Sequence, residues 1–374
     1  MGNPFDEQRA LAAGAAVALL DRGVVTVSGP DRLSWLDSIT SQQLASLVPG
    51  ESAETLILDP NGRIEHAMRV VDDGETAWLI VDDGDAPALA AWLDRMRFML
   101  RVEVADRTAD FAVVGFVRPF SGPLSESEER PLSAPPSEPG ERRVSGPLSE
   151  PEGRVEGTVV WHDPWTSVQD GGWQYATTPD HPAAGWSWSE TVVPRERLDA
   201  LDATVPGAAA EALRIAAWRP AFSSEVDERS IPHELDWLRS AVHLAKGCYR
   251  GQETVAKVHN LGHPPRRLVF LHVDGSDHEL PQHGDEVVLA GTDDVVGRVT
   301  SAANHWELGP IALAVVKRSV DPAATLEVVY RRAAVEGGAE SAGRLAAAQE
   351  VVVPPDAGAT AHVPRIPRLG SVRR

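Results

Sequence analysis

Five short apolar segments, separated by clusters of proline, glycine and aspartate, follow one another in the last third of the chain. They are residues 268–272, 286–289, 295–302, 311–316 and 326–330. This length and spacing are typical of strands joined by turns, and a series of such strands favours a small antiparallel barrel. We therefore expect residues 263–335 to form a C-terminal β-barrel domain. Residues 336–374 are rich in alanine and glycine at first and in arginine later, so we expect a flexible tail.

The first 115 residues mix strand and helix patterns. Strand-like segments are expected at 54–58, 64–71, 76–81 and 102–104, and helices at 10–20, 28–39 and 85–98. Turn signals at Asn61-Gly62 and Asp73-Gly74 join successive strands. This combination predicts an N-terminal α+β domain over residues 1–115. The apolar run 10–20 is too short to span a bilayer and lacks a basic leader, so we expect a cytoplasmic protein without membrane contact.

The segment 121–156 has a different composition, dominated by serine, proline and glutamate, with no aromatic residue. The sequence Ser-Gly-Pro-Leu-Ser-Glu occurs in it twice. Such a segment cannot bury enough apolar surface to offset the entropy of ordering it. We expect a disordered insert, followed by a second α+β domain over residues 157–262.

Five tryptophans crowd the start of that second domain. They are Trp161, Trp165, Trp173, Trp186 and Trp188. An aromatic binding platform is one interpretation, but a domain core is favoured because aromatic side chains dominate core burial. The alternation of Trp186 and Trp188 with serine is typical of one face of a strand. Residues 195–217 are helical in pattern, with a break at Pro206-Gly207.

The only cysteine of the 374 residues, Cys248, lies in an unusual octapeptide. The octapeptide consists of Lys246, Gly247, Cys248, Tyr249, Arg250, Gly251, Gln252 and Glu253. Two cations favour the thiolate electrostatically, and two glycines allow a close approach of a ligand. The alternative is that Cys248 is a small buried apolar residue. One cysteine excludes both an intrachain disulfide and a four-cysteine cluster site on this chain alone.

The octapeptide resembles the signature K-G-C-Y-x-G-Q-E of the YgfZ family, folate-binding proteins of iron–sulfur cluster maintenance that are related to the glycine-cleavage T-protein (GcvT, aminomethyltransferase). Other segments are similar to that family too. Residues 214–220 resemble its R-I-x-x-G-x-P segment, with Trp218 and Arg219 departing from it, and Pro232-His233-Glu234 resembles its P-x-E. Four further segments are also similar to that family, namely residues 29–33, 61–64, 297–301 and 311–314.

The resemblance implies an α+β fold, a GcvT-like multi-domain ring with an N-terminal α/β folate-binding region and a C-terminal antiparallel β-barrel. It implies tetrahydrofolate as cofactor and iron–sulfur proteins or their assembly machinery as partners. Cys248 is then a functional thiol assisted by Lys246, and Glu234 binds the pterin ring. The remaining octapeptide residues, Gly247, Tyr249, Arg250, Gly251, Gln252 and Glu253, are expected around the cofactor.

One departure bears on catalysis. T-proteins have two consecutive aspartates shortly after a G-G-I sequence, and these positions fall on His66 and Ala67 here. Neither supplies a carboxylate, although an imidazole can act as a base. The primary expectation is thus a folate-binding accessory protein rather than a conventional enzyme. A folate-dependent one-carbon transferase is the alternative, and a hydrolase using Cys248 with His243 or His259 is a third.

The formal net charge of −20 disfavours a nucleic-acid partner. Residues 242–267 depart from this trend, with five cations and one acid. Either these are ordinary solvated side chains or they form a basic patch for a small anion such as the glutamate tail of a folate. We expect no metal site, because the segment around His259 and His263 does not read as a helix and no cysteine or carboxylate completes a ligand set there.

Overall fold

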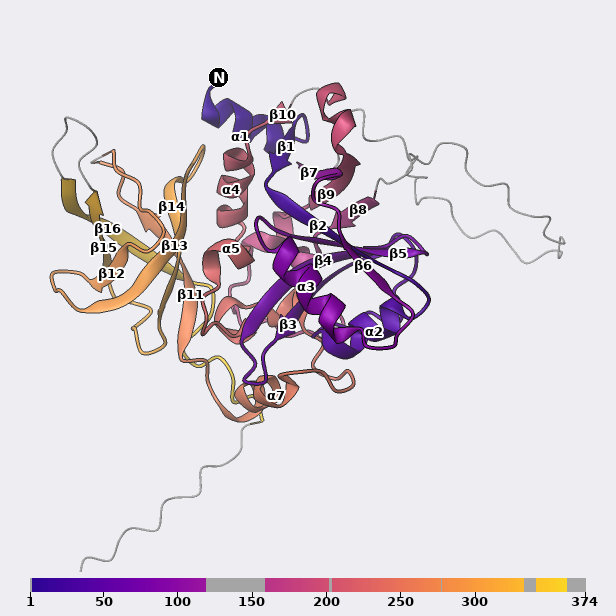
Figure 1. Ribbon diagram of the computed structural model, residues 1–374. Helices are drawn as coiled ribbons and strands as arrows, with labels where there is room; N and C mark the ends of the chain where they lie inside the picture. Colours follow the sequence, from indigo (N-terminus) through magenta and orange to yellow (C-terminus); the bar gives the residue numbers. More distant parts are fainter. Residues whose placement is uncertain (1, 119–158, 202–203, 277, 333–340, 362–374) are drawn as a thin grey trace, which may run out of the picture.

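The computed structural model describes residues 2–118, 159–201, 204–276, 278–332 and 341–361, and these form two five-stranded sheets and a closed barrel. In Figure 1 the barrel lies at one side and the two sheets at the other, with helix α4 (Gly207–Ala216) between them. The expected insert at 121–156 lies outside the described residues.

The first sheet has the strand order β3-β4-β5-β2-β6 and is antiparallel throughout. Its strands are β2 (Arg22–Ser28), β3 (Ser52–Leu58), β4 (Ile64–Asp72), β5 (Thr76–Asp82) and β6 (Glu103–Asp106). Helices α2 (Arg32–Ile39) and α3 (Ala86–Met96) cover one face through the apolar side chains Leu36, Leu89 and Leu93. The apolar patterns thus predicted β3, β4, β5 and both helices, and β6 to within two residues, whereas β2 was not predicted.

The second sheet has the order β10-β1-β7-β9-β8, in which only the β1–β10 pair is parallel. Its strands are β1 (Val17–Leu20), β7 (Phe111–Val117), β8 (Val159–His162), β9 (Trp188–Pro194) and β10 (Thr204–Val205). The chain passes from this sheet to the first through a single residue, Asp21. The proposed boundary after residue 115 therefore does not separate the two sheets.

Several helix predictions need correction. Residues 10–20 do not form one helix: α1 is Pro4–Ala12, and the β-branched Val17 begins a strand instead. Residues 195–217 are divided into a 3₁₀ segment, Arg195–Ala200, the short strand β10 and α4, because Pro206-Gly207 interrupts the pattern. The remaining helical segments are α5 (Phe222–Glu225), α6 (Leu238–Ala241) and α7 (Gln252–Leu261), with 3₁₀ turns at Pro164–Thr166, Pro182–Gly185 and Pro232–Leu235.

The expected antiparallel barrel is confirmed, with the closed order β11-β14-β13-β12-β15-β16. Its strands are β11 (Arg266–Val273), β12 (Glu286–Leu289), β13 (Val295–His305), β14 (Gly309–Lys317), β15 (Leu326–Arg332) and β16 (Ser341–Val351). The expectation of a flexible tail from residue 336 was wrong for β16, which pairs with both β15 and β11. Without this strand the barrel would have two unpaired edges.

The tryptophan-rich segment contributes to the core, as expected. Trp161 and Trp165 are fully buried, and Trp186 and Trp188 are nearly so. Trp173 is the exception at 43% exposed. Trp161 on β8 donates its indole N–H to the carbonyl of Ala53 on β3, where β8 packs against β3 and β4, so it helps to fix how the two sheets face one another.

Candidate functional site

The octapeptide forms a loop that leads into helix α7 and is held against the hairpin turn between β3 and β4. Gly251 has a left-handed backbone, with φ of 86°. A Cβ at this position would lie 2.7 Å from the carbonyl oxygen of Asp59 in that turn, so a side chain here would push the loop away. By contrast, a Cβ on Gly247 would meet nothing within 4 Å. Only one of the two glycines is therefore needed for the loop's position.

The described contacts of the Lys246 ammonium are with groups other than the thiol. Its side chain is 3% exposed and forms an ion pair with Asp37 at 3.3 Å. The ammonium donates hydrogen bonds to the backbone carbonyls of Asp37 at 2.5 Å, Thr40 at 3.0 Å and Gln42 at 2.7 Å. These carbonyls lie at the carboxyl end of α2, where a cation is favoured. Burial lowers the pKa of Lys246, and Asp37 opposes that shift. The side chain therefore anchors the loop.

Cys248 itself is exposed. Among the described residues no group hydrogen-bonds to its sulfur, so the expectation of a thiol available to a partner is compatible with the geometry. Neither His243 nor His259 reaches it: His259 lies 3.1 Å from the Tyr175 hydroxyl, and Nδ1 of His243 is buried without a partner among the described residues. The geometry gives no support to a Cys/His hydrolase.

Two other octapeptide side chains also hold the loop. Arg250 forms an ion pair with Glu65 at 2.6 Å, and Gln252 donates to the carbonyl of Lys246 at 3.1 Å. The ring of Tyr249 is buried, its hydroxyl has no partner among the described residues, and the ammonium of Lys246 lies 5.6 Å from the ring centre. Glu253 is exposed in the first turn of α7, where a negative charge stabilises the helix.

Glu234 is the second expected site residue whose surroundings differ from the prediction. It is completely buried, and Arg266 of β11 binds its carboxylate bidentately at 3.1 Å and 2.8 Å. The pterin was expected to occupy this same edge of the carboxylate. The geometry instead gives Glu234 a structural role, because it fixes the turn Pro232–Leu235 to the barrel.

We expect Glu234→Ala to lower the free energy of unfolding by about 1–3 kcal/mol, because it removes the buried partner of Arg266. Asp227→Ala is the matched control, since it removes the half-exposed partner of the same arginine and should cost about 1 kcal/mol or less. Denaturant unfolding measures both. A Glu234 variant as stable as the wild type would contradict the structural role.

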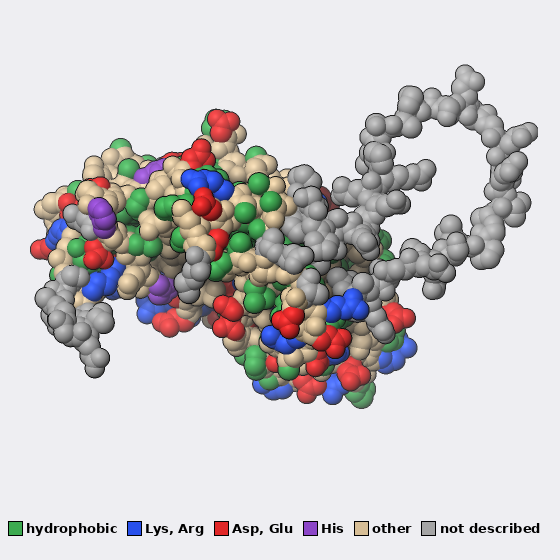
Figure 2. Space-filling model, turned by 90° about the horizontal axis from the view of Figure 1, so that it is seen from above, with side chains coloured by type: hydrophobic (Ala, Val, Ile, Leu, Met, Phe, Trp, Pro, Cys, Tyr) green, Lys and Arg blue, Asp and Glu red, His purple; other side chains and the backbone are tan. Residues whose placement is uncertain are grey.

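The expected basic patch over residues 242–267 does not exist as a free surface. Lys246, Arg250 and Arg266 are paired as described above, and Arg267 is fully buried where it donates to the carbonyl of Val320 at 3.0 Å. Lys257 alone among these five cations is exposed and has no ion pair with a described residue. On the face shown in Figure 2, acidic and basic side chains are likewise interspersed.

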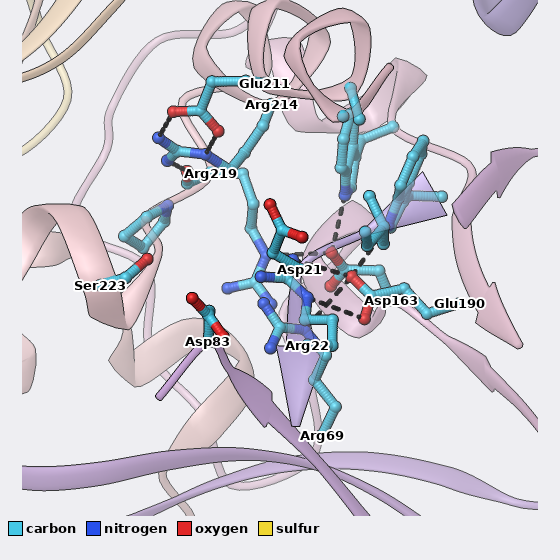
Figure 3. Close-up of a pocket in the computed structure, with 16 residues that line it drawn as sticks. Asp21, Arg22, Arg69, Asp83, Asp163, Glu190, Glu211, Arg214, Arg219 and Ser223 are labelled. Atoms are coloured by element: carbon cyan, nitrogen blue, oxygen red, sulfur yellow. Dashed lines mark hydrogen bonds and ion pairs between the residues drawn. The ribbon is translucent and has the colours of Figure 1, made fainter. Parts of the chain in front are cut away.

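A cavity of about 270 Å³ lies where the chain crosses between the two sheets, beside α4. We call it the arginine cavity. Its charged lining residues are Asp21, Arg22, Arg69, Asp83, Asp163, Glu190, Glu211, Arg214 and Arg219. Figure 3 shows Arg22 and Arg69 beside Glu190, Arg214 bound to Glu211 at one end, and Asp83 with Ser223 on another side. Its volume is just below the range of roughly 300–1,000 Å³ usual for small-molecule sites.

A network of buried ion pairs lies beside this cavity, centred on Asp82, which does not line it. Arg22 and Arg69 both donate to Asp82, at 2.8 Å and 3.0 Å, and Arg22 also donates to Glu190 at 3.1 Å and 3.3 Å. Burial alone would raise the pKa of Asp82, but these two guanidinium groups hold it well below its usual value. Asp82 is therefore charged at neutral pH, and the two guanidinium groups that bind it also hold the lining residue Glu190 in place.

Trp186 and Trp188 line one wall of the cavity as a stacked pair. Their rings stack at 5.3 Å with planes 15° apart. Trp186 donates its indole N–H to Asp163 at 2.7 Å, and Trp188 donates to Glu190 at 3.2 Å. Gly115 on β7 makes room for this wall, since a Cβ there would lie 2.1 Å from the Trp188 ring. Such a wall suits a planar aromatic group.

A second cavity of about 250 Å³ is lined by polar residues, among them Gln42, Glu54, Asp170, Ser240 and His243. Its residue Gln42 supplies one of the carbonyls that bind Lys246, so it lies near the base of the octapeptide loop. Neither cavity is lined by Cys248 or Glu234.

Strand β4 carries the two positions where T-proteins are expected to have aspartates. Ala67 is on the same face as Arg69, two residues on, and so points toward the side of the arginine cavity. His66 is on the opposite face, where its Nδ1 lies 2.8 Å from a carboxylate oxygen of Asp85 and its ring stacks on Phe222. The cavity side of β4 therefore lacks a carboxylate at this position, whereas its other side carries an imidazole oriented by an acid.

Sequence reasoning missed most of the arginine cavity. Glu190 continues the alternation of Trp186 and Trp188, which places all three on one face of the chain. A charged residue on the same strand face as two tryptophans could have indicated a cavity lined by both kinds of side chain. Arg219 had already been noted as a departure from the family segment. By contrast, the pairing of Arg22 with Glu190 spans 168 residues and carries no local signal.

The described residues contain no cluster of three or more histidine, cysteine, aspartate or glutamate side chains arranged to hold a metal ion. The prediction that residues 259–263 are non-helical was wrong in part, because His259 lies within α7. Within the described ranges, no helix has the length and apolar character needed to cross a bilayer.

Comparison with known proteins shows similarity to aminomethyltransferases over most of the chain. Residues 266–338 match the glycine cleavage T-protein C-terminal barrel domain. The aminomethyltransferase of Rippkaea orientalis is 26% identical over 324 residues, covering 83% of this chain and 80% of that protein. The aminomethyltransferase of Nostoc sp. is 25% identical over 309 residues, covering 79% of this chain and 74% of that protein. The crystal structure of glycine cleavage system aminomethyltransferase T from Bartonella henselae matches with a TM-score of 0.63 at 17% sequence identity. The match covers 92% of this chain and 88% of that one, so the two proteins share a fold.

Proposed function

We propose that this protein binds a tetrahydrofolate in the arginine cavity and serves as an accessory protein for iron–sulfur cluster assembly or repair, with Cys248 as its functional thiol. The observation that carries the role of the thiol is the exposure of the lone sulfur on a loop that Lys246, Arg250 and Gln252 hold in place. Iron–sulfur proteins or their assembly machinery are the proposed partners, in line with the K-G-C-Y-x-G-Q-E resemblance.

The residues of the cavity fit the pteridine part of a folate. The indole wall suits a planar bicyclic ring. Oδ1 of Asp163 accepts one hydrogen bond, from the backbone N–H of Trp165, and Oε2 of Glu190 accepts one, from Arg22. Each oxygen can accept a further bond from a ring N–H or amino group. When bound, the folate would supply a one-carbon carrier, and the protein's own residues would bind and orient it.

The absence of a carboxylate at Ala67 supports an accessory role over the transfer reaction of the T-proteins. A second candidate function is a folate-dependent aminomethyl or one-carbon transferase. The similarity to aminomethyltransferases and the His66–Asp85 pair favour it, because a carboxylate-oriented imidazole can act as a general base.

One experiment separates the two candidates. Purified protein is titrated with tetrahydrofolate by calorimetry and then incubated with tetrahydrofolate and an aminomethyl-loaded lipoyl carrier protein. The accessory role predicts binding without formation of methylenetetrahydrofolate above the rate without protein. Product formation that is lost in His66→Gln would favour the transferase. Failure to bind tetrahydrofolate would refute both.

A further inference from the structure

Three consecutive apolar side chains protrude from the loop between α3 and β6. Phe98 is 82% exposed, Met99 is 97% exposed and Leu100 is 40% exposed. Phe98 and Met99 are the two most exposed large apolar side chains among the described residues. Single exposed apolar residues are common on protein surfaces, but adjacent ones that protrude together point to a contact with another molecule. We call residues 98–100 the apolar tip.

The backbone of the apolar tip is held in a costly conformation. The turn is closed by a hydrogen bond from the N–H of Leu100 to the carbonyl of Arg97 at 2.9 Å. Phe98 is at its second position with φ of 45°, where glycine, asparagine or aspartate is usual. A bulky side chain in this left-handed region costs free energy, and the exposed ring of Phe98 regains little of it by burial. Strain that burial does not offset indicates a functional constraint.

The base of the loop is held on both sides. Arg97 donates to the carbonyl of Val102 at 3.2 Å, and Val102 is buried in the same core as α3. Arg101 binds Asp31 through its backbone N–H at 2.9 Å and through its guanidinium at 2.8 Å and 3.1 Å. Gly29 lets the loop lie close, since a Cβ there would be 2.2 Å from the carbonyl oxygen of Arg101. The tip is therefore preorganised, which lowers the entropic cost of binding.

The charges around the apolar tip restrict what it could contact. Arg97 pairs with Asp94, and Arg101 pairs with Asp31. Arg95, in the last turn of α3, is exposed and has no ion pair with a described residue. An anionic membrane would be repelled by a chain with a net charge of −20.

A second copy of this chain would have to offer the tip an apolar pocket. Both cavities described above are instead lined largely by charged or polar side chains. A different protein, with an acidic side chain beside an apolar pocket, complements both the tip and the unpaired Arg95.

We propose that the apolar tip inserts into an apolar pocket of a partner protein, at whose rim a carboxylate meets Arg95. This inference rests on the proposed function, in which the partner is an iron–sulfur protein or part of its assembly machinery. Phe98 and Met99 are the anchors, because aromatic and methionine side chains are enriched in the cores of interfaces. The partner supplies the burial that the strained Phe98 lacks in the free protein.

Phe98→Gly separates binding from stability, because glycine adopts a φ of 45° without strain. We expect this variant to unfold at no lower denaturant concentration than the wild type, and to rescue iron–sulfur enzyme activity in cells at least about fivefold less well. Met99→Ser should lower rescue in the same way. Val48→Ser is the control, since Val48 is 60% exposed on another loop, and it should rescue fully.

The outcomes distinguish this inference from the function on which it rests. Full rescue by Phe98→Gly and Met99→Ser, in cells that the wild type rescues, would overturn the inference alone. Failure of the wild type to rescue would refute the proposed function and the inference with it.

Arg95→Glu tests the carboxylate at the rim of the pocket. We expect rescue to fall at least about threefold, because the variant places a negative charge against that carboxylate. Arg298→Glu on the barrel is the control and should rescue fully. Unchanged rescue by Arg95→Glu would contradict an acidic rim.

Two measurements on purified protein address the other occupants. Light scattering should give a monomer, and the protein should not cosediment with vesicles of anionic phospholipid. A dimer that Phe98→Gly abolishes would assign the tip to a second copy and overturn the inference. Vesicle binding that Phe98→Gly abolishes would assign the tip to a membrane, with the same consequence.

Discussion

Replacing Cys248 with alanine is expected to abolish rescue of iron–sulfur enzyme activity in cells that lack this protein, while the free energy of unfolding changes by less than about 0.5 kcal/mol. The sulfur is exposed and no described residue hydrogen-bonds to it, so the fold loses little. Function should be lost completely, because no second cysteine exists in the chain to replace it. Activity of an iron–sulfur enzyme in complemented cells and denaturant unfolding of purified protein measure the two effects.

Gly247→Ala is the matched control for this loop. A Cβ at Gly247 has open space around it, so the loop should keep its shape and rescue should be retained. Loss of rescue in both variants would attribute the effect to the loop rather than to the sulfur. Full rescue by Cys248→Ala would exclude a function for the thiol.

Arg219→Ala is expected to destabilise the protein by about 3–5 kcal/mol, the largest stability effect we anticipate for one residue of the cavity. Glu54 and Asp163 are 3% and 2% exposed, and both lose their guanidinium partner in this variant. Glu54 retains the Ser240 hydroxyl and Asp163 the Trp186 N–H, but neither supplies a positive charge. Two buried carboxylates would therefore be left without their cation.

Chemical denaturation of wild type and variant measures this effect. Arg298→Ala is the control, because Arg298 has a side chain 60% exposed and pairs with Glu286 at the surface, where an ion pair contributes about 0–1 kcal/mol. A loss below about 1 kcal/mol for Arg219→Ala would mean that water or rearranged side chains compensate the two carboxylates. That result would contradict the role of Arg219 as their fixed cation.

The barrel shows what the sequence could and could not predict about the fold. Its first five strands are apolar, short and bounded by turn residues, which makes each one recognisable locally. The sixth, β16, reads Ser-Ala-Gly-Arg-Leu-Ala-Ala-Ala-Gln-Glu-Val, with few residues that favour strands. It forms because β15 and β11 each need a neighbour, and that requirement is tertiary.

The candidate site shows the same limit. The octapeptide was recognisable as a unit, and Cys248 is exposed as a partner-facing thiol must be. The partners of Lys246 and Glu234 were not predicted, because they are not visible locally. Lys246 binds carbonyls more than 200 positions away, and Glu234 binds Arg266 on another domain. The sign of a charge can be read from sequence, but the partner that neutralises it cannot.

The central claim is that a folate occupies the arginine cavity. A crystal structure of the protein in complex with tetrahydrofolate tests it most directly. We predict the pteridine ring in the arginine cavity beside Trp186 and Trp188, and Glu234 still bound to Arg266. A folate bound elsewhere, or one that displaces Arg266 to reach Glu234, would contradict this claim.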